Sequence, residues 1–112
     1  MNQDSDDIVA SKLAALAHPV RLATIRQLAA AGPAGLAAGK LAERLDVAPN
    51  ALTFHLQKLA AVGLVESRRE GQFVYYRAVF DTLLALTEHL VGACCCEAED
   101  SCGPSCPTSQ RR

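Results

Sequence analysis

A chain of 112 residues is long enough for one small domain, and its 50% apolar content is enough for a modest core. No apolar stretch approaches the ~20 residues that span a bilayer, and the acidic start of the chain is unlike a signal peptide, so we expect a cytoplasmic protein with no membrane segment. Removing the acidic ends, −3 over residues 1–7 and −1 over residues 97–112, from the net charge of −1 leaves +3 on residues 8–96. Net charge alone therefore neither indicates nor excludes a nucleic-acid partner.

Two helices are predicted at the start of the chain, over residues 8–17 and 20–31, where alanine and leucine recur at helical spacing. Pro19 separates them, because it disfavours the α conformation at His18 and suits the first turn of the following helix. The sequence AGPAG at residues 31–35 then ends the second helix and opens a loop. We therefore expect a corner between the first two helices and a break after the second.

A helix-turn-helix unit is predicted next, with a first helix over residues 36–45, a turn at residues 46–48 and a second helix that runs from Pro49 to Gly63. One stripe of the second helix has the spacing of a core face, namely Leu52, His55, Leu56, Leu59 and Ala60. The other face carries Asn50, Thr53, Phe54, Gln57 and Lys58. Amide and hydroxyl groups can hydrogen-bond base edges or phosphates, as a helix that reads the major groove requires. A merely solvated helix face is the alternative.

A β-hairpin is predicted after this helix, with strands over residues 64–67 and 73–78 and with Gly71 in the loop, where a positive φ is needed. A hairpin that follows a helix-turn-helix is a wing. The expected fold class is therefore mainly α with a two-stranded β-hairpin (α+β), a winged helix-turn-helix. The wing carries Arg68, Arg69 and Arg77, which can meet phosphates or the minor groove. Alternatively, these arginines only keep an exposed hairpin soluble.

A last helix is predicted over residues 81–93, which are again apolar at helical spacing. The first and last helices offer surplus apolar surface that two subunits could share, so we expect a homodimer. Two reading helices related by a two-fold axis would match an inverted repeat in double-stranded operator DNA, and two basic bodies would together carry about +6. The alternative is that both helices close the core of one subunit.

All the cysteines lie in the last fifth of the chain: Cys94, Cys95, Cys96, Cys102 and Cys106. A disulfide framework would spread its bridges through the fold, so this clustering indicates a local thiol site in a reducing compartment. We divide the chain into an acidic N-terminal tail at residues 1–7, a DNA-binding and dimerisation domain at 8–93 and a cysteine-rich tail at 94–112. The histidines and carboxylates form no catalytic motif, so we expect no enzyme.

The stretch LAERLDVAPNALTFHLQKLAAVGLVESRREGQFVYYR, residues 41–77, resembles the ArsR/SmtB family of metal-sensing repressors. It contains the family's Ser or Thr two residues before His-Leu, a Gly-Leu-Val step and a Tyr-rich wing strand. The resemblance extends over roughly residues 8–93 and implies a dimeric winged helix that leaves its operator when a metal or metalloid binds. The predicted DNA contacts are Asn50, Thr53, Phe54, His55, Gln57, Lys58, Arg68 and Arg69. For His55 we expect a mixture of helix packing and phosphate contact.

Two metal sites known in this family lack their ligands here. Arsenic-sensing members of the best-known type carry cysteines in the pattern C.C..C on the first helix of the helix-turn-helix, and the matching positions are Ala37, Gly39 and Ala42. A family zinc site on the last helix uses Asp and His two residues apart, whereas Asp81 here leaves only His89 as a candidate ligand, too few for the about four that zinc prefers. We therefore expect sensing by the C-terminal thiols.

Clustered thiolates without histidine favour soft ions, and As(III) takes three sulfurs in a pyramid. The adjacent Cys95 and Cys96, with Cys102, supply three sulfurs from one chain, and Cys94 and Cys106 are possible auxiliary ligands. A C-terminal CC.....C site also resembles that of a subset of arsenic-responsive family members. The sequence thus predicts As(III), or Sb(III) with the same chemistry, as the inducer, with no organic cofactor.

Three alternatives for the cysteines stay open. The thiols can oxidise to disulfides and sense redox state. They can hold another soft metal, such as Cd(II), Hg(II), Cu(I) or Zn(II), although the Cys-Cys-Cys run lacks the usual CxxC zinc spacing. Finally, the tail can be unstructured with incidental cysteines.

Overall fold

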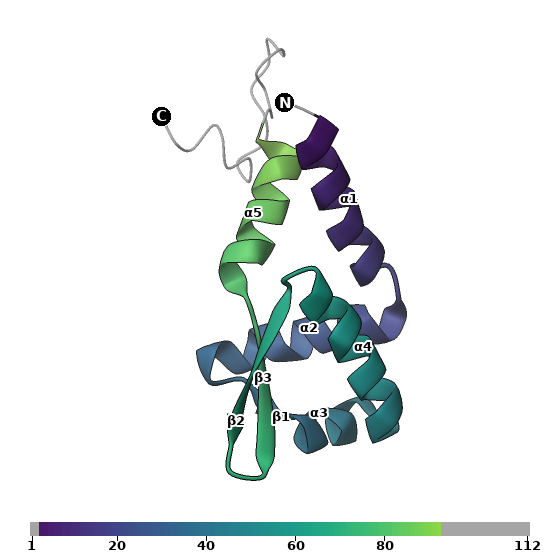
Figure 1. The fold of residues 1–112 in the computed structure, drawn as a ribbon, viewed down its shortest axis with the longest axis vertical. Coiled ribbons are helices and arrows are strands. Elements are labelled where there is room, and N and C mark those ends of the chain that lie inside the picture. Colours follow the sequence, from purple (N-terminus) through teal and green to yellow (C-terminus); the bar gives the residue numbers. More distant parts are fainter. Residues whose placement is uncertain (1–2, 93–112) are drawn as a thin grey trace. The chain divides into compact units, whose positions relative to one another are not determined.

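The fold was established from a computed structural model, which describes residues 3–92 (Figure 1). In chain order the elements are helices α1 (Gln3–Leu16) and α2 (Pro19–Ala31), a 3₁₀ turn η1 (Gly32–Ala34), strand β1 (Leu36–Ala37), helices α3 (Ala38–Leu45) and α4 (Pro49–Ala61), strands β2 (Val65–Glu70) and β3 (Phe73–Ala78), and helix α5 (Phe80–Val91). They form two compact units, one that ends at Phe80 and one that begins at Asp81 with the body of α5. The predicted fold class, mainly α with a β-hairpin, is confirmed.

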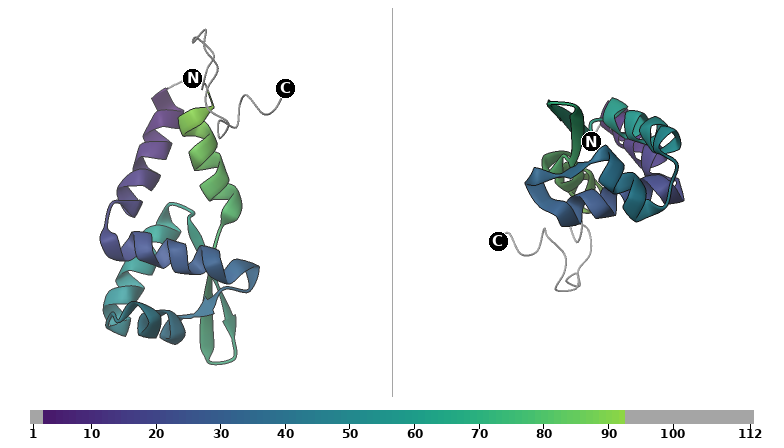
Figure 2. Two further views of the ribbon diagram at one scale, coloured as in Figure 1. Left: turned by 180° about the vertical axis from the view of Figure 1, so that it is seen from behind. Right: turned by 90° about the horizontal axis from the view of Figure 1, so that it is seen from below.

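The core of the first unit is built from leucines on several elements. Those with at most 1% of their surface exposed are Leu28, Leu41, Leu52, Leu56, Leu59 and Leu64. Viewed from behind, α2 lies in front of α4 and the hairpin (Figure 2, left), and it contacts α1, α3, α4 and β3. Thr24 is fully buried on α2, where its hydroxyl donates to the Val20 carbonyl at 2.7 Å, so its burial leaves no polar group unsatisfied.

The corner between α1 and α2 follows the sequence prediction. His18 is extended (φ −151°, ψ 129°), as expected for a residue before proline, and Pro19 occupies the first turn of α2. The His18 Nδ1 accepts a hydrogen bond from the Val20 N–H at 3.2 Å and so caps the helix.

The sheet has one strand more than the sequence indicated. Residues 36 and 37, predicted as the start of a helix, instead form β1 and pair with β3, so that the strand order is β1-β3-β2. The approach is close, because a Cβ at Gly35 would overlap the carbonyl oxygen of Tyr76. Gly35 also has a φ of 72°, which favours glycine. This backbone contact cannot be read from apolar periodicity.

The hairpin is also longer than predicted. β2 continues through Arg68 and Arg69 to Glu70, and only Gly71 and Gln72 form the loop, since Glu70 pairs with Phe73. Gly71 has a φ of 64°, as predicted for the loop glycine, and a glycine at the first loop position fits a type II′ turn.

At the N-terminus, α1 begins at Gln3, so most of the segment predicted as an acidic tail is helical. Within residues 3–92, no single helix is long and apolar enough to span a membrane; α1 and α2 meet that criterion only together, as a pair bent by 96°.

Candidate nucleic-acid interface

The turn between α3 and α4 is short and is held by backbone hydrogen bonds. Asp46 is left-handed (φ 55°, ψ 49°), and its N–H donates to the Glu43 carbonyl at 3.2 Å. The Val47 N–H donates to the Ala42 carbonyl at 3.1 Å. Pro49 then occupies the first turn of α4, where its missing N–H costs no helical hydrogen bond. These contacts fix the direction in which α4 leaves α3, which is the geometry of a helix-turn-helix.

Helix α4 buries one face and exposes the other. Leu52, Leu56 and Leu59 are buried in the core. At about 100° per residue, Phe54 and Asn50 lie nearly opposite these leucines, with Gln57 beside them. All five residues predicted on the outer face, Asn50, Thr53, Phe54, Gln57 and Lys58, are exposed. The predicted core stripe differs at Ala60, which is exposed, and at His55, which is only half-buried.

The polar groups of this outer face make local bonds that DNA could replace. The Asn50 Oδ1 accepts from the Ala51 N–H at 3.0 Å, and the Thr53 hydroxyl donates to the Pro49 carbonyl at 3.0 Å. The amide of Gln57 has no hydrogen-bond partner among the described residues, so both its donor and its acceptor are free. Exposed groups with exchangeable partners meet the requirement for contacts to base edges or phosphates.

His55 lies between the outer face and the core and contacts α2. Its ring centroid is 4.5 Å from that of His18, and its Nδ1 accepts a hydrogen bond from the Arg21 Nε at 3.1 Å. Burial first, and then electrostatic interactions with His18 and Arg21, lower the pKa of His55 below its ordinary 6.5. The neutral ring thus accepts at Nδ1 and carries its proton on Nε2, where it can donate to a phosphate.

The wing separates its charged side chains by face, because side chains alternate along a strand. Glu66, Arg68 and Glu70 lie on one face of β2, together with Tyr75 and Arg77 of the paired strand. Arg68 forms an ion pair with Glu70 at 2.6 Å, lies 4.9 Å from the Tyr75 ring centroid and donates to the Ala34 carbonyl. Arg77 forms an ion pair with Glu66. The guanidinium groups on this face are therefore engaged within the protein.

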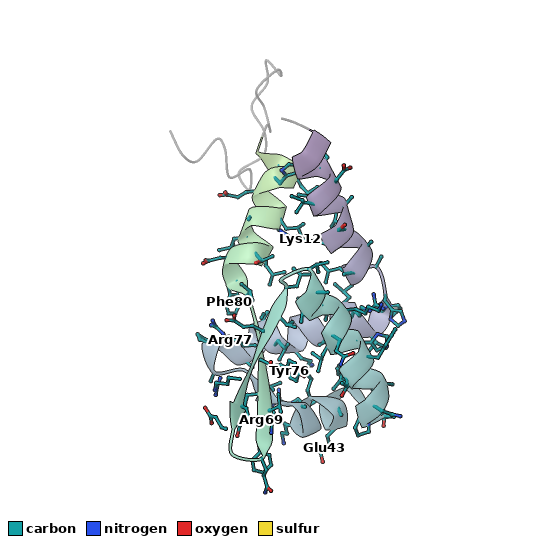
Figure 3. The ribbon with its side chains drawn as sticks, viewed as in Figure 1. Lys12, Glu43, Arg69, Tyr76, Arg77 and Phe80 are labelled. Carbon is teal, nitrogen blue, oxygen red and sulfur yellow. The ribbon has the colours of Figure 1, made fainter. Side chains whose placement is uncertain are left out.

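Arg69 lies on the opposite face of β2, the face on which Val65 and Ala78 are buried. Figure 3 shows it on the lower half of the hairpin, nearer the loop than Arg77. No interaction of its guanidinium with another described residue is present, and its cross-strand neighbour is the apolar Val74. Of these two neighbouring arginines, which the sequence prediction treated alike, only Arg69 is unpaired among the described residues.

Arsenic-sensing ArsR/SmtB members carry cysteines on the first helix of the helix-turn-helix, and the matching positions in this chain hold no metal donor. Ala37 is half-buried in β1 and Ala42 is buried, while Gly39 and Ala42 line a shallow hollow of about 440 Å³. Within residues 3–92, no group of three or more His, Cys, Asp or Glu side chains is placed to hold a metal ion. The predicted ligands Cys95, Cys96 and Cys102, with Cys94 and Cys106, lie outside the described residues.

Sequence comparison places the chain among bacterial regulators. A helix-turn-helix domain family matches residues 16–68. The nodulation protein NolR of Rhizobium meliloti is 36% identical over 80 residues, a stretch that is 71% of this chain but only 63% of NolR. A biofilm growth-associated repressor of Agrobacterium fabrum is 34% identical over 92 residues, which are 82% of this chain and 76% of the repressor.

Solved structures that resemble this chain are also those of transcriptional regulators. An ArsR-like transcriptional regulator from Rhodococcus sp. RHA1 superposes with a TM-score of 0.67 at 36% identity, over 80% of this chain and 84% of the other. The homodimeric winged helix-turn-helix DNA-binding domain of Mb0332 from Mycobacterium bovis, described as a possible ArsR-family regulator, superposes with a TM-score of 0.64 at 28% identity. That similarity covers 91% of this chain and 97% of the other.

Proposed function

Because this chain belongs to the ArsR family of winged helix-turn-helix transcriptional regulators, we propose that it is a homodimeric repressor that releases its operator DNA when As(III) or Sb(III) binds its C-terminal cysteines. DNA binding rests on the exposed face of α4, and inducer binding rests on the cysteine cluster.

The outer face of α4 enters the major groove of double-stranded DNA. Its amide and hydroxyl groups, on Asn50, Thr53 and Gln57, reach base edges or phosphates, and Lys58 supplies a positive charge. His55 donates from Nε2 to a phosphate at the side of this face. On the wing, Arg69 contacts the adjacent backbone or minor groove.

A homodimer is supported by exposed apolar side chains on the first and last helices. Ile8 is 57% exposed on α1, and Leu84 and Leu90 are 63% and 58% exposed on α5. A contiguous exposed apolar patch marks a surface that another subunit can cover. The Mb0332 domain is described as homodimeric, which agrees with this assignment. A two-fold dimer presents two copies of α4, which suit an operator with an inverted repeat.

The proposed inducer follows from the chemistry of the cysteines. Three thiolates match the three-sulfur pyramid of As(III), and Cys95, Cys96 and Cys102 supply them within eight positions of one chain. The described part of the protein offers no competing donor set. Such thiols persist in a reducing cytoplasm, which is also where operator DNA is found.

Coupling between the inducer and the operator is proposed to pass through α5. Cys94 follows Val91, the last residue of α5, by three positions, so closing the thiolates around As(III) constrains the end of this dimer helix. A change in dimer geometry alters the relative angle of the two copies of α4. Allosteric couplings of this kind are worth about 1–3 kcal/mol, or roughly 5- to 150-fold in affinity.

The alternative with the same fold is a repressor that senses thiol oxidation or another soft metal, since the same cysteines can form disulfides or bind Cd(II), Hg(II) or Zn(II). Fluorescence anisotropy of the full-length reduced protein on a selected operator duplex separates these possibilities. As(III) and Sb(III) should release the DNA at micromolar concentration, whereas diamide, Cd(II) and Zn(II) should not. If diamide or Zn(II) releases the DNA and As(III) does not, thiol oxidation or zinc binding is the signal and As(III) is not the inducer.

A further inference from the structure

Phe54 is a large apolar side chain on the polar face of α4. Its surface is 51% exposed, and it lies nearly opposite the buried Leu52 and Leu56. It takes no part in the core, and its neighbours on the outer face are the amides of Asn50 and Gln57. Single apolar side chains are common on protein surfaces, so the residues around Phe54 decide what this one can do.

Two neighbours on the same helix hold the Phe54 ring. The Lys58 Nζ lies 5.1 Å from the ring centroid, within the range of a cation–π interaction. The His55 ring meets it edge-on, with the two centroids 5.7 Å apart. His55 is in turn bonded to Arg21. The aromatic ring is thus oriented before any ligand arrives, which reduces the entropy lost on binding.

An aromatic ring at the centre of a groove-reading helix has one apolar partner among the base pairs. The major-groove edge of each pair presents hydrogen-bonding groups, and only thymine adds a methyl group, at C5. Lys58 beside the ring supplies the positive charge that suits a nearby phosphate.

We propose that Phe54 packs against the C5 methyl group of a thymine, which makes α4 selective for thymine over uracil or cytosine at one position in each half of the operator. The inference rests on the proposed DNA-binding function and adds a specificity-determining residue to it. The amides of Asn50 and Gln57 then read the base pairs on either side.

The test uses duplexes selected from a random-sequence pool by the full-length wild-type protein. Each thymine of the selected duplex is replaced singly by uracil, which removes only the methyl group. Burial of one methyl is worth about fourfold in affinity, and replacement in both half-sites about 15-fold. Because 5-methylcytosine carries the same methyl, a duplex with 5-methylcytosine should also bind about fourfold more tightly than one with cytosine at that position.

Phe54→Ala should bind the thymine duplex more weakly and should lose its sensitivity to uracil at that position. Phe54→Leu, which keeps an apolar side chain, should retain part of that sensitivity. Gln57→Ala is the matched control: its overall affinity should fall, but the penalty for uracil should remain. Thermal unfolding should be unchanged in all three, since each residue is exposed.

The inference is overturned if the wild-type protein binds thymine and uracil duplexes equally at every position. It is equally overturned if Phe54→Ala keeps the full penalty for uracil. A pool that yields no bound duplex would instead show that the proposed DNA-binding function fails, and the inference would fall with it.

Discussion

The Arg21 Nε–H donates to the Nδ1 of His55 at 3.1 Å, and this bond ties α2 to the helix that carries the proposed DNA contacts. A second nitrogen of Arg21 donates to the Ala15 carbonyl near the end of α1, so one side chain links three helices. The bond requires an unprotonated Nδ1, since a protonated imidazole has no acceptor. This link between α2 and α4 is therefore lost when His55 Nδ1 is protonated.

The first prediction is that the protein loses stability when pH falls below the ordinary pKa of histidine. The pKa of His55 is lowered in the folded state, so the unfolded chain binds a proton at pH values where the folded chain does not. The free energy of unfolding should be independent of this group above about pH 6.5 and should fall as pH decreases through that value. Urea unfolding at a series of pH values between 5 and 8 measures the slope.

Two variants test whether His55 causes this dependence of stability on pH. His55→Gln keeps an acceptor for Arg21 but cannot titrate, so the slope below pH 6.5 should become shallower. His18→Asn keeps a helix cap and should retain most of the slope, because burial of His55, rather than its interaction with His18, is the larger cause of the lowered pKa. An unchanged slope in His55→Gln would rule out this residue as the titrating group.

The second prediction concerns the wing, where Arg68 is paired and Arg69 is not. Arg69→Ala should weaken operator binding and reduce the slope of log affinity against log salt by about 0.9, the value for one lost phosphate contact. Arg68→Ala should change that slope much less, because its guanidinium is already engaged by Glu70 and Tyr75. Equal effects of the two variants would mean that the ion pair opens on DNA.

The third prediction concerns the close approach of Gly35 to β3. In Gly35→Ala the new Cβ would overlap the Tyr76 carbonyl oxygen, lie 2.9 Å from its carbonyl carbon and occupy a residue with φ of 72°. We expect a loss of about 2–4 kcal/mol in the free energy of unfolding. Gly39→Ala on α3 is the control, since its Cβ meets nothing within 4 Å, and it should gain up to about 1 kcal/mol. Urea denaturation measures the free energy of unfolding of both variants, and equal values for Gly35→Ala and Gly39→Ala would contradict the prediction.

The fourth prediction concerns the dimer. Ile8→Glu on α1 and Leu84→Glu on α5 place a charge on apolar side chains that are more than half exposed, so each should dissociate the dimer at micromolar concentration and weaken operator binding. Leu22→Glu on α2 is the control, with an equally apolar and 48% exposed side chain outside both helices. Sedimentation equilibrium should show a monomer only for the first two; a wild-type monomer would contradict the dimer.

Much of the fold could be predicted from periodicity. The leucines of α4 have the spacing of a buried stripe, Pro19 indicates the corner between α1 and α2, and Gly71 indicates the hairpin turn. These signals are local, because each depends on residues within a few positions along the chain. The elements they predict are present.

The features that the sequence missed depend on contacts between distant segments. Strand β1 forms because Leu36 pairs with Tyr76, forty positions away, and no local pattern shows that pairing. The bond from Arg21 to His55 spans 34 positions. Arg68 pairs with Glu70 because both side chains lie on one face of β2. The sequence prediction placed both residues in a five-residue loop, where the alternation of a strand does not apply, although an acidic residue two positions after Arg68 was a usable signal.

The most direct test of the proposed function is As(III)-induced release of the operator by serine variants of the five cysteines. Single variants Cys95→Ser, Cys96→Ser and Cys102→Ser should bind operator DNA as the wild type does but should stay bound when As(III) is added. Cys94→Ser and Cys106→Ser should be released normally. If As(III) releases every one of these variants as readily as the wild type, the C-terminal cysteines are not the sensor.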